Sequence, residues 1–302
     1  MNAAVAVGSL SFTLIKIVLR HLSPLSLAAG RVAFSAMFFV TIVIAQPHRR
    51  QRIERGDRWR VLLCGLGGSA GFHILFSWGQ ARVSISVSAV VLGTMPAVVA
   101  VAEIVFMRHR VTWAQMVGLL LSLAGIVVIS WGSGGSERST LPGIIAVAAA
   151  TVVWSAVTVA TRSFAGRYDP WWVNTPGTVV GAGVMLIVVA PRLGQFSHLS
   201  VVSWVVIVWL GAAGSAFVYA ALAGAMKTLS ATTAASLATL VTPLSIIIGW
   251  IAISDRPGPN AAFGSVAVVA GVVLVSRQRI HGSYRTTVSA AASMHPDRVE
   301  SG

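Results

Sequence analysis

The sequence predicts an all-α polytopic membrane protein with ten transmembrane helices, arranged as two inverted five-helix repeats. Three observations lead to this prediction. Of the 302 residues, 56% are hydrophobic and 10% are charged, whereas about a quarter of the residues in a soluble domain are charged. Apolar runs of about 20 residues, the length that a helix needs to cross a bilayer, recur along the chain. An internal repeat divides these runs into two sets of five.

Ten candidate spans follow one another along the chain, joined by mostly short connections. They lie at residues 3–20, 26–45, 60–79, 86–107, 114–132, 142–161, 172–190, 203–224, 231–253 and 260–276. The segment 47–58 and the tail after Ser276 are longer and polar. Because the tail, 277–302, is polar and rich in small residues, we expect it to be a disordered cytoplasmic segment.

Lysine and arginine are distributed unevenly between the two sides of these spans. With the N-terminus inside, 15 of them fall on inner segments and 5 on outer segments, while Lys16 and Arg31 lie within spans. The positive-inside rule therefore predicts a multi-pass protein of the cytoplasmic (inner) membrane with both termini in the cytoplasm. This distribution accounts for the net charge of +14. Because no basic helix face or aromatic-basic module occurs, we expect no nucleic-acid partner.

The two sets of spans match when the sequence is shifted by 146 residues. Matched pairs share a residue type or a charge, and they are Ser9 and Ser155, Lys16 and Arg162, Pro24 and Pro170, Gly65 and Gly211, Gly68 and Gly214, Gly118 and Gly264 and, with one inserted residue, Pro96 and Pro243. Each repeat, 1–133 and 141–276, contains five spans. Because five is odd, the second repeat enters the membrane in the opposite sense, a plan that is typical of secondary transporters.

Six segments carry a resemblance to a known family. Those of the first half are VGSLSFTLIKIVLRHLSPLSLAAGR, GLGGSAGFHILFSWGQARVSISVSAVVLGTMPAV and WAQMVGLLLSLAGIVVISWG, and those of the second half are VVWSAVTVATRSF, LGAAGSAFVYAALAGAMKTLSATTAASLATLVTPLSIIIGW and FGSVAVVAGVVLV. In this order they resemble the EamA-type transporters of the drug/metabolite transporter superfamily, over about residues 6–276. The family often has an acidic motif after the fourth span of each half. Here Asp255 takes that role in the second half, and Arg108 stands there in the first. Of the family's Trp-Gly pair in the first span, Gly8 is present.

The resemblance implies two EamA-like repeats and a secondary active transporter. It would carry a small organic metabolite or drug across the inner membrane by alternating access, with export favoured and protons as a candidate coupling ion. The alternative is a non-transporting membrane protein, either a lipid-handling enzyme or a scaffold. Because no catalytic, metal-ligand or Walker motif occurs in the sequence, we expect no enzyme activity, no cofactor and no metal. The expected partners are a small-molecule solute and the lipid bilayer, and a monomer and a homodimer both remain open.

Ionisable residues within spans are candidates for function. Arg31 is seven residues past Pro24, about 10 Å along a helix. It is either a structural arginine bonded to carbonyls of neighbouring helix ends, or a cation that lines the outward cavity and attracts anionic or zwitterionic solutes. Lys16 and its repeat partner Arg162 lie at span ends, where their long stems can reach the interface, so we interpret them as interface anchors.

Glu103 is the acidic residue that lies well inside a predicted span, seven residues after Pro96 and on nearly the same helix face. An unpaired carboxylate in apolar surroundings binds a proton readily, so Glu103 could couple transport to the proton gradient. The alternative is an ion pair or hydrogen bond with arginines of the inner loops. On the first interpretation, Glu103 is among the candidates for the substrate pathway.

Four further polar or aromatic residues complete the candidates for the pathway. His73 is either a cavity residue or a packed histidine, and Trp78, about 140° around the helix from it, is either a pathway residue or an aromatic-belt anchor. Trp154 is the aromatic that the second repeat retains in its first span. Asn174 is either a polar group of the cavity or a helix cap.

Pro96 and Pro243 lie near the middle of their spans at matched positions. Proline removes a backbone hydrogen bond and kinks a helix. The kinks could be purely structural, but matched kinks in inverted halves favour moving elements, so both prolines are candidate hinges. Glycine-rich segments 65–71 and 177–183 have the small-residue spacing of helix packing seams.

Overall fold

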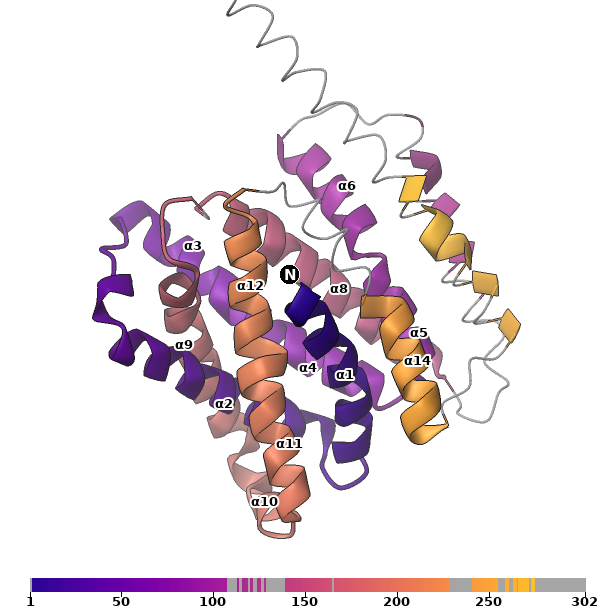
Figure 1. Cartoon of the computed structure of the whole chain (residues 1–302), viewed down its shortest axis with the longest axis horizontal. Helices are drawn as coiled ribbons and strands as arrows, with labels where there is room; N and C mark the ends of the chain where they lie inside the picture. The colour runs from indigo at the N-terminus through magenta and orange to yellow at the C-terminus, as the bar shows by residue number, and fades with distance from the viewer. Residues whose placement is uncertain are drawn as a thin grey trace, which may run out of the picture.

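The computed structural model describes residues 2–107, 139–164, 166–228 and 241–254, together with isolated residues of 113–128 and parts of 259–274. The elements of this described part are all helices (Figure 1), which confirms the prediction of an all-α protein. Predicted spans 114–132 and 260–276 fall largely outside the described residues, and the predicted tail 277–302 falls wholly outside them.

The helices of the two halves follow the same order. The first half contains α1 (Asn2–Val18), α2 (Pro24–Ala45), η1 (Pro47–Arg49), α3 (Arg55–Leu66), η2 (Gly67–Gly71), α4 (Phe72–Gln80), α5 (Ile85–Gly93) and α6 (Met95–Met107). The second half contains α8 (Leu141–Arg162), α9 (Pro170–Val189), η3 (Ala190–Arg192), α10 (Gly194–Ser197), α11 (Val201–Gly211), η4 (Ala212–Phe217), α12 (Val218–Ala225) and α14 (Val241–Ile253). Figure 1 shows α11 and α12 continuing as one rod.

Six helical segments among the described residues are long and apolar enough to cross a bilayer. They are Pro24–Ala45, Arg55–Gln80, Ile85–Ala102, Leu141–Arg162, Pro170–Arg192 and Val201–Ala225, and two shorter apolar helices are Ala3–Val18 and Val241–Ile253. These eight segments coincide wholly or in part with eight of the ten predicted spans. The chain is therefore a multi-pass membrane protein.

Short polar side chains fix the points at which several helices begin. Ser23, Ser84, Thr140, Asp169 and Ser200 each accept a hydrogen bond from a backbone N–H in the first turn of the helix that follows. These are the residue types that satisfy the free N–H groups of a first helical turn. Because proline also occupies the first turn of α2, α8 and α9, where it costs no hydrogen bond, these starts are set by local sequence.

Helices at matched positions of the two halves pack against each other in matching ways. Where α3 meets α9, a Cβ built on Gly177 would lie 2.4 Å from the Cα of Gly65. Where α11 meets α2, a Cβ built on Gly211 would lie 2.8 Å from the carbonyl oxygen of Arg31. The offset of 146 relates Gly65 to Gly211 and Arg31 to Gly177. Glycine thus allows the backbones to touch in both places. Segments 65–71 and 177–183, each predicted to be a packing seam, meet each other in the first of these contacts.

The segments η2 and η4 are π-helical turns that interrupt two spans at matched positions. The offset places residues 67–71 of η2 on 213–217, within η4. Such turns are rare and occur often at functional sites because they rotate the side chains that follow and free backbone groups. The helices that continue from them, α4 and α12, supply residues to a shared cavity.

Candidate functional site

A cavity of about 120 Å³ lies between helices of both halves. Aromatic rings form much of its wall. The ring centres of Phe12 and Phe76 are 5.4 Å apart, edge to face, and Phe72 stacks on Phe76 at 5.2 Å. Phe72 also lies 5.1 Å from Trp154, which brings the predicted pathway residue of α8 into the same wall. The cavity is therefore mainly apolar and ring-lined, with few polar groups.

Arg31 of α2 lines this cavity and is 3% exposed. Its Nη2 lies 3.5 Å from the Oγ of Ser215 in η4. Its Nε and Nη1 have no hydrogen-bond partner, and no carboxylate pairs with it, within the part of the chain that the structure describes. A purely structural arginine would bond to carbonyls of neighbouring helix ends, and among the described residues none accepts from Arg31. The guanidinium is thus a buried cation with unused donors.

His73 and Tyr219 meet in the same wall and are related by the 146-residue offset. The Nε2 of His73 lies 2.8 Å from the Tyr219 hydroxyl, which in turn donates to the carbonyl oxygen of Gly68 at 2.6 Å. Since Gly68 belongs to η2, the two halves are joined at this turn. The Nδ1 of His73 has no partner among the described residues. Both interpretations of His73 apply in part, because it packs against Tyr219 and lines the cavity.

A second cavity, of about 20 Å³, lies on the other side of Trp154 and Tyr219, which line both. Cys64, Thr161 and Asn174 are among its lining residues, and they lie toward the ends of helices that we predict to face the cytoplasm. Asn174 Nδ2 donates to the carbonyl of Pro170 at 2.8 Å. Asp169, not Asn174, caps α9. Trp154 and Tyr219 therefore separate the central cavity from a small inner cavity.

Trp78 and Pro243 do not line the central cavity. Trp78 is 39% exposed, with the guanidinium carbon of Arg82 3.7 Å from its ring centre, whereas Pro243 follows the lining residue Thr242. Pro96 does line the cavity and stands in the first turn of α6, directly after the helix is interrupted at Thr94.

Three charged candidates lie away from this cavity or cannot be placed. Lys16 is half-buried in the last turn of α1, and Arg162 is half-buried in the last turn of α8. Both residues lie at helix ends, and their interpretation as interface anchors stays a prediction. Glu103 belongs to α6, but its side chain lies outside the described part of the chain.

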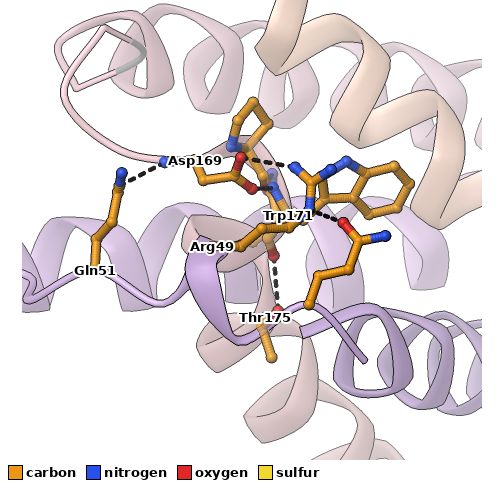
Figure 2. A network of polar contacts seen from close by, with 8 residues as sticks. Arg49, Gln51, Asp169, Trp171 and Thr175 are labelled. Atoms are coloured by element: carbon orange, nitrogen blue, oxygen red, sulfur yellow. Dashed lines mark hydrogen bonds and ion pairs between the residues drawn. The ribbon is translucent and has the colours of Figure 1, made fainter. Parts of the chain in front are cut away.

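The connection between α2 and α3 meets the connection between α8 and α9 in a polar network. Arg49 Nη1 lies 2.8 Å from Asp169 Oδ2, and the side-chain oxygen of Gln51 accepts from the Asp169 backbone N–H at 2.8 Å. Asp169 Oδ1 also accepts from the Trp171 backbone N–H at 2.9 Å. Figure 2 shows Arg49 and Gln51 converging on Asp169. One carboxylate thus caps α9 and binds the first half of the chain.

A second ion pair reinforces this junction. Arg167 Nη1 lies 2.8 Å from Asp57 Oδ2, and the Tyr168 hydroxyl donates to the same oxygen at 2.9 Å. A tyrosine hydroxyl is protonated near neutral pH, and burial raises the pKa of Tyr168 further, so it remains a donor. Asp57 stands in the first turn of α3, where a negative charge is favoured. We call the Arg49–Asp169 and Arg167–Asp57 pairs together the inner junction, because the lysine and arginine distribution predicts that this end faces the cytoplasm.

The opposite end of the molecule carries a neutral counterpart of the inner junction. The 146-residue offset maps Arg49 onto Gln195 and Asp169 onto Ser23. Gln195 Oε1 accepts from the Ser23 backbone N–H at 3.2 Å and from the Ser26 hydroxyl at 3.0 Å. The same positions therefore join the two halves at both ends, by charge at one end and by neutral hydrogen bonds at the other.

We expect Asp169→Asn to loosen the inner junction, because asparagine caps a helix as well as aspartate does but cannot pair with Arg49. The Arg49 side chain is 26% exposed and the Asp169 side chain is 16% exposed. Because the ion pair is partly exposed, its loss should cost about 0.5–1 kcal/mol of the free energy that holds this junction closed. Cys64, the single cysteine, lines the inner cavity and reports opening there. Its modification by a membrane-impermeant maleimide should accelerate about two- to fivefold in inside-out vesicles. Ser23→Ala, at the outer end, is the control and should leave the rate of Cys64 modification unchanged. An unchanged rate in Asp169→Asn would contradict the role of Asp169 in keeping the inner end closed.

Tyr219 and Ser215 are among the residues of the site that the sequence did not single out, together with the wall residues Phe12, Phe72 and Phe76. Adding 146 to 73 gives 219, so the repeat could have paired His73 with Tyr219 in advance. The π-helical turns left no comparable signal, because their glycine-rich sequences are equally typical of packing seams. Ser215 was hidden for the same reason, since it lies inside η4.

Long apolar helices around an internal cavity with a buried cation define a polytopic membrane protein that can hold a small solute. A model of the EamA-like transporter family matches residues 2–131 and 141–277. The chain belongs to this family, as the order of its motifs predicts.

Two relatives and one solved structure extend this assignment. A probable terminal-alkyne amino-acid exporter of Streptantibioticus cattleyicolor is 26% identical over 238 residues, which cover 79% of this chain and 80% of that protein. An uncharacterized transporter of Archaeoglobus fulgidus is 26% identical over 271 residues, 89% of this chain and 95% of the relative. A solved crystal structure has a TM-score of 0.61 at 20% identity and covers 91% of this chain and 96% of that one; at this identity the similarity bears on the fold alone.

Proposed function

We propose that the protein is a secondary active transporter that exports a small organic solute across the cytoplasmic (inner) membrane by alternating access. The observation that carries the proposal is the cavity of about 120 Å³ whose wall is built from both halves of the chain. A site between two halves changes its access when one half moves against the other. Membership of a transporter family gives this geometry a transport role.

The architecture that we propose is ten spans in two inverted repeats, residues 1–133 and 141–276, with both termini in the cytoplasm. The family model matches the chain twice, once over each repeat. Support also comes from the contact of Gly65 with Gly177 and its offset-related contact of Gly211 with Arg31. In an inverted pair, an exchange of conformation between the halves turns an outward-open state into an inward-open one.

Two features favour alternating access over a fixed pore. Trp154 and Tyr219 separate the central cavity from the inner one, so a solute in the centre is closed off from the side that we predict to be cytoplasmic. Inner and outer connections join the halves at offset-related positions, as Arg49–Asp169 and Gln195–Ser23. Each of these contacts can open while the other stays closed.

The direction and the class of solute rest on the relatives. The Streptantibioticus relative is named a probable exporter of an amino acid, which favours export of a small metabolite. Flux is tested with purified full-length protein in proteoliposomes loaded with single amino acids, aromatic acids or a cationic dye, under imposed proton and sodium gradients. Gradient-driven flux of one class is the expected result. Absence of flux for all classes would instead favour the non-transporting alternative, a lipid-handling enzyme or a scaffold.

We also propose that protons drive the transport, with Glu103 as the carrier of the proton within its span. A glutamine at this position keeps the size of the side chain and cannot take up a proton. Glu103→Gln should therefore abolish the proton dependence of flux while leaving solute exchange between the two sides intact. Proton-driven flux that is the same in Glu103→Gln and in wild type would remove Glu103 from this role and favour an ion pair with inner-loop arginines.

A further inference from the structure

We infer that the central cavity selects a small monocarboxylate with an apolar, ring-sized body, and that Arg31 binds its carboxylate. The inference rests on the proposed function, in which this cavity is the substrate site. It goes further by naming the chemical class of the substrate and the residue that recognises it. Burial, hydrogen bonding, cavity size and charge each bear on it separately.

Arg31 has donors that nothing in the described structure uses. Its Nε and Nη1 are buried and unpartnered, and its one hydrogen bond, from Nη2 to Ser215, is long at 3.5 Å. Leaving charged donors unpaired away from water is costly. The guanidinium presents its N–H groups as a planar fork that fits the two oxygens of a carboxylate. A bound carboxylate would supply the counter-charge and the acceptors that the described neighbours lack.

The rest of the wall sets the size and polarity of the solute. Phe12, Phe72, Phe76 and Trp154 offer ring faces and edges, and rings packed in such arrangements favour an aromatic guest. The volume of about 120 Å³ is close to the cavity of about 150 Å³ that accommodates benzene in another protein. A single ring or a short branched chain therefore fits, whereas a multi-ring compound does not.

The charge of the wall argues against cations and weakens the case for zwitterions. Among the described residues that line the cavity, none is acidic. The hydroxyls of Ser11 and Thr242 already donate to the carbonyls of Val7 and Ala89. The ammonium group of an amine or amino acid would thus meet Arg31 in an apolar wall with no counter-charge among the described residues, while a monocarboxylate leaves the pair neutral.

Binding of radiolabelled benzoate to the detergent-solubilised full-length protein tests this class directly. Competitors that carry the same ring vary the charge: benzamide is neutral and has the shape of benzoate, benzylamine is a cation of similar size, and phenylalanine is a larger zwitterion. We expect benzoate to compete at least about tenfold better than benzamide, because a charge-assisted bond is about twice as strong as a neutral one, and benzylamine not to compete. Benzamide or benzylamine competing as well as benzoate in the wild-type protein would overturn the inference, without reference to any variant.

Variants assign the effect to Arg31. Arg31→Gln should lose benzoate affinity by about tenfold or more and bind benzamide as wild type does, whereas Arg31→Lys should retain part of it because it keeps charge but not the planar fork. Arg82→Gln is the matched control, since Arg82 stacks on Trp78 away from the cavity. Unchanged benzoate affinity in folded Arg31→Gln would overturn the assignment.

Flux distinguishes a failure of this inference from a failure of the proposed function. Proteoliposomes that transport another solute, made from protein that binds no benzoate, would overturn the inference and leave the proposed function intact. Benzoate binding that depends on Arg31, without flux of any tested solute, would sustain the binding site and contradict transport.

Discussion

The Gly177→Ala variant is expected to unfold at a clearly lower temperature than the wild-type protein. A Cβ at this position would lie 2.4 Å from the Gly65 Cα and 2.8 Å from the Leu62 carbonyl oxygen. Because both atoms belong to the backbone of α3, no side-chain rotation can relieve the overlap, and the two helices must separate. Overpacking of this kind costs about 1–3 kcal/mol or more. It would also loosen the contact that joins the first half of the chain to the second.

Gly183 on the same helix provides the matched control. It is exposed, and a Cβ built on it meets nothing within 4 Å. Gly183→Ala should therefore leave stability unchanged or raise it by up to about 1 kcal/mol, because alanine favours the helix more than glycine does. Thermal unfolding in one detergent, followed by monodisperse elution, compares the two. Equal melting temperatures for Gly177→Ala and Gly183→Ala would show that α3 and α9 do not touch as described.

The positions of the spans and the depth of Arg31 could be predicted from the sequence, because each is set by one continuous stretch of residues. Hydropathy located eight helices because each span is an unbroken apolar run, and the spacing from Pro24 placed Arg31 deep within α2. The small-residue spacing of segments 65–71 and 177–183 predicted that each packs closely against another helix, and Gly65 and Gly177 do so. These properties need no knowledge of which helices are neighbours.

Features that depend on how helices rotate against each other could not be predicted in this way. Trp78 and Trp154 were equally good candidates for the pathway, yet Trp154 faces the cavity and Trp78 faces outward, beneath Arg82. The pairing of Arg49 with Asp169 joins residues 120 positions apart, and nothing in either connection indicates the other. The π-helical turns add a local rotation that a regular helical period does not represent.

Tyr219→Phe is the second substitution for which we expect a large effect. Phenylalanine retains the ring, whose centre lies 4.5 Å from Trp154, but it removes the hydroxyl that bonds His73 and the Gly68 carbonyl. Both partners are buried, and a buried polar group that loses its partner costs about 1–3 kcal/mol. The closure between the central and inner cavities should weaken, since Tyr219 lines both.

Modification of Cys64 measures that closure, because this residue lies on the inner side of Tyr219. A loss of 1 kcal/mol changes a two-state population about fivefold, so Tyr219→Phe should accelerate maleimide modification by about that factor or more in inside-out vesicles. His73→Phe should act in the same direction, and the double variant should add little to Tyr219→Phe because one hydrogen bond is shared. Fully additive effects would show that His73 and Tyr219 act separately. Modification at the wild-type rate in Tyr219→Phe would mean that packing of Trp154 against the ring, and not the hydroxyl, keeps the inner cavity closed.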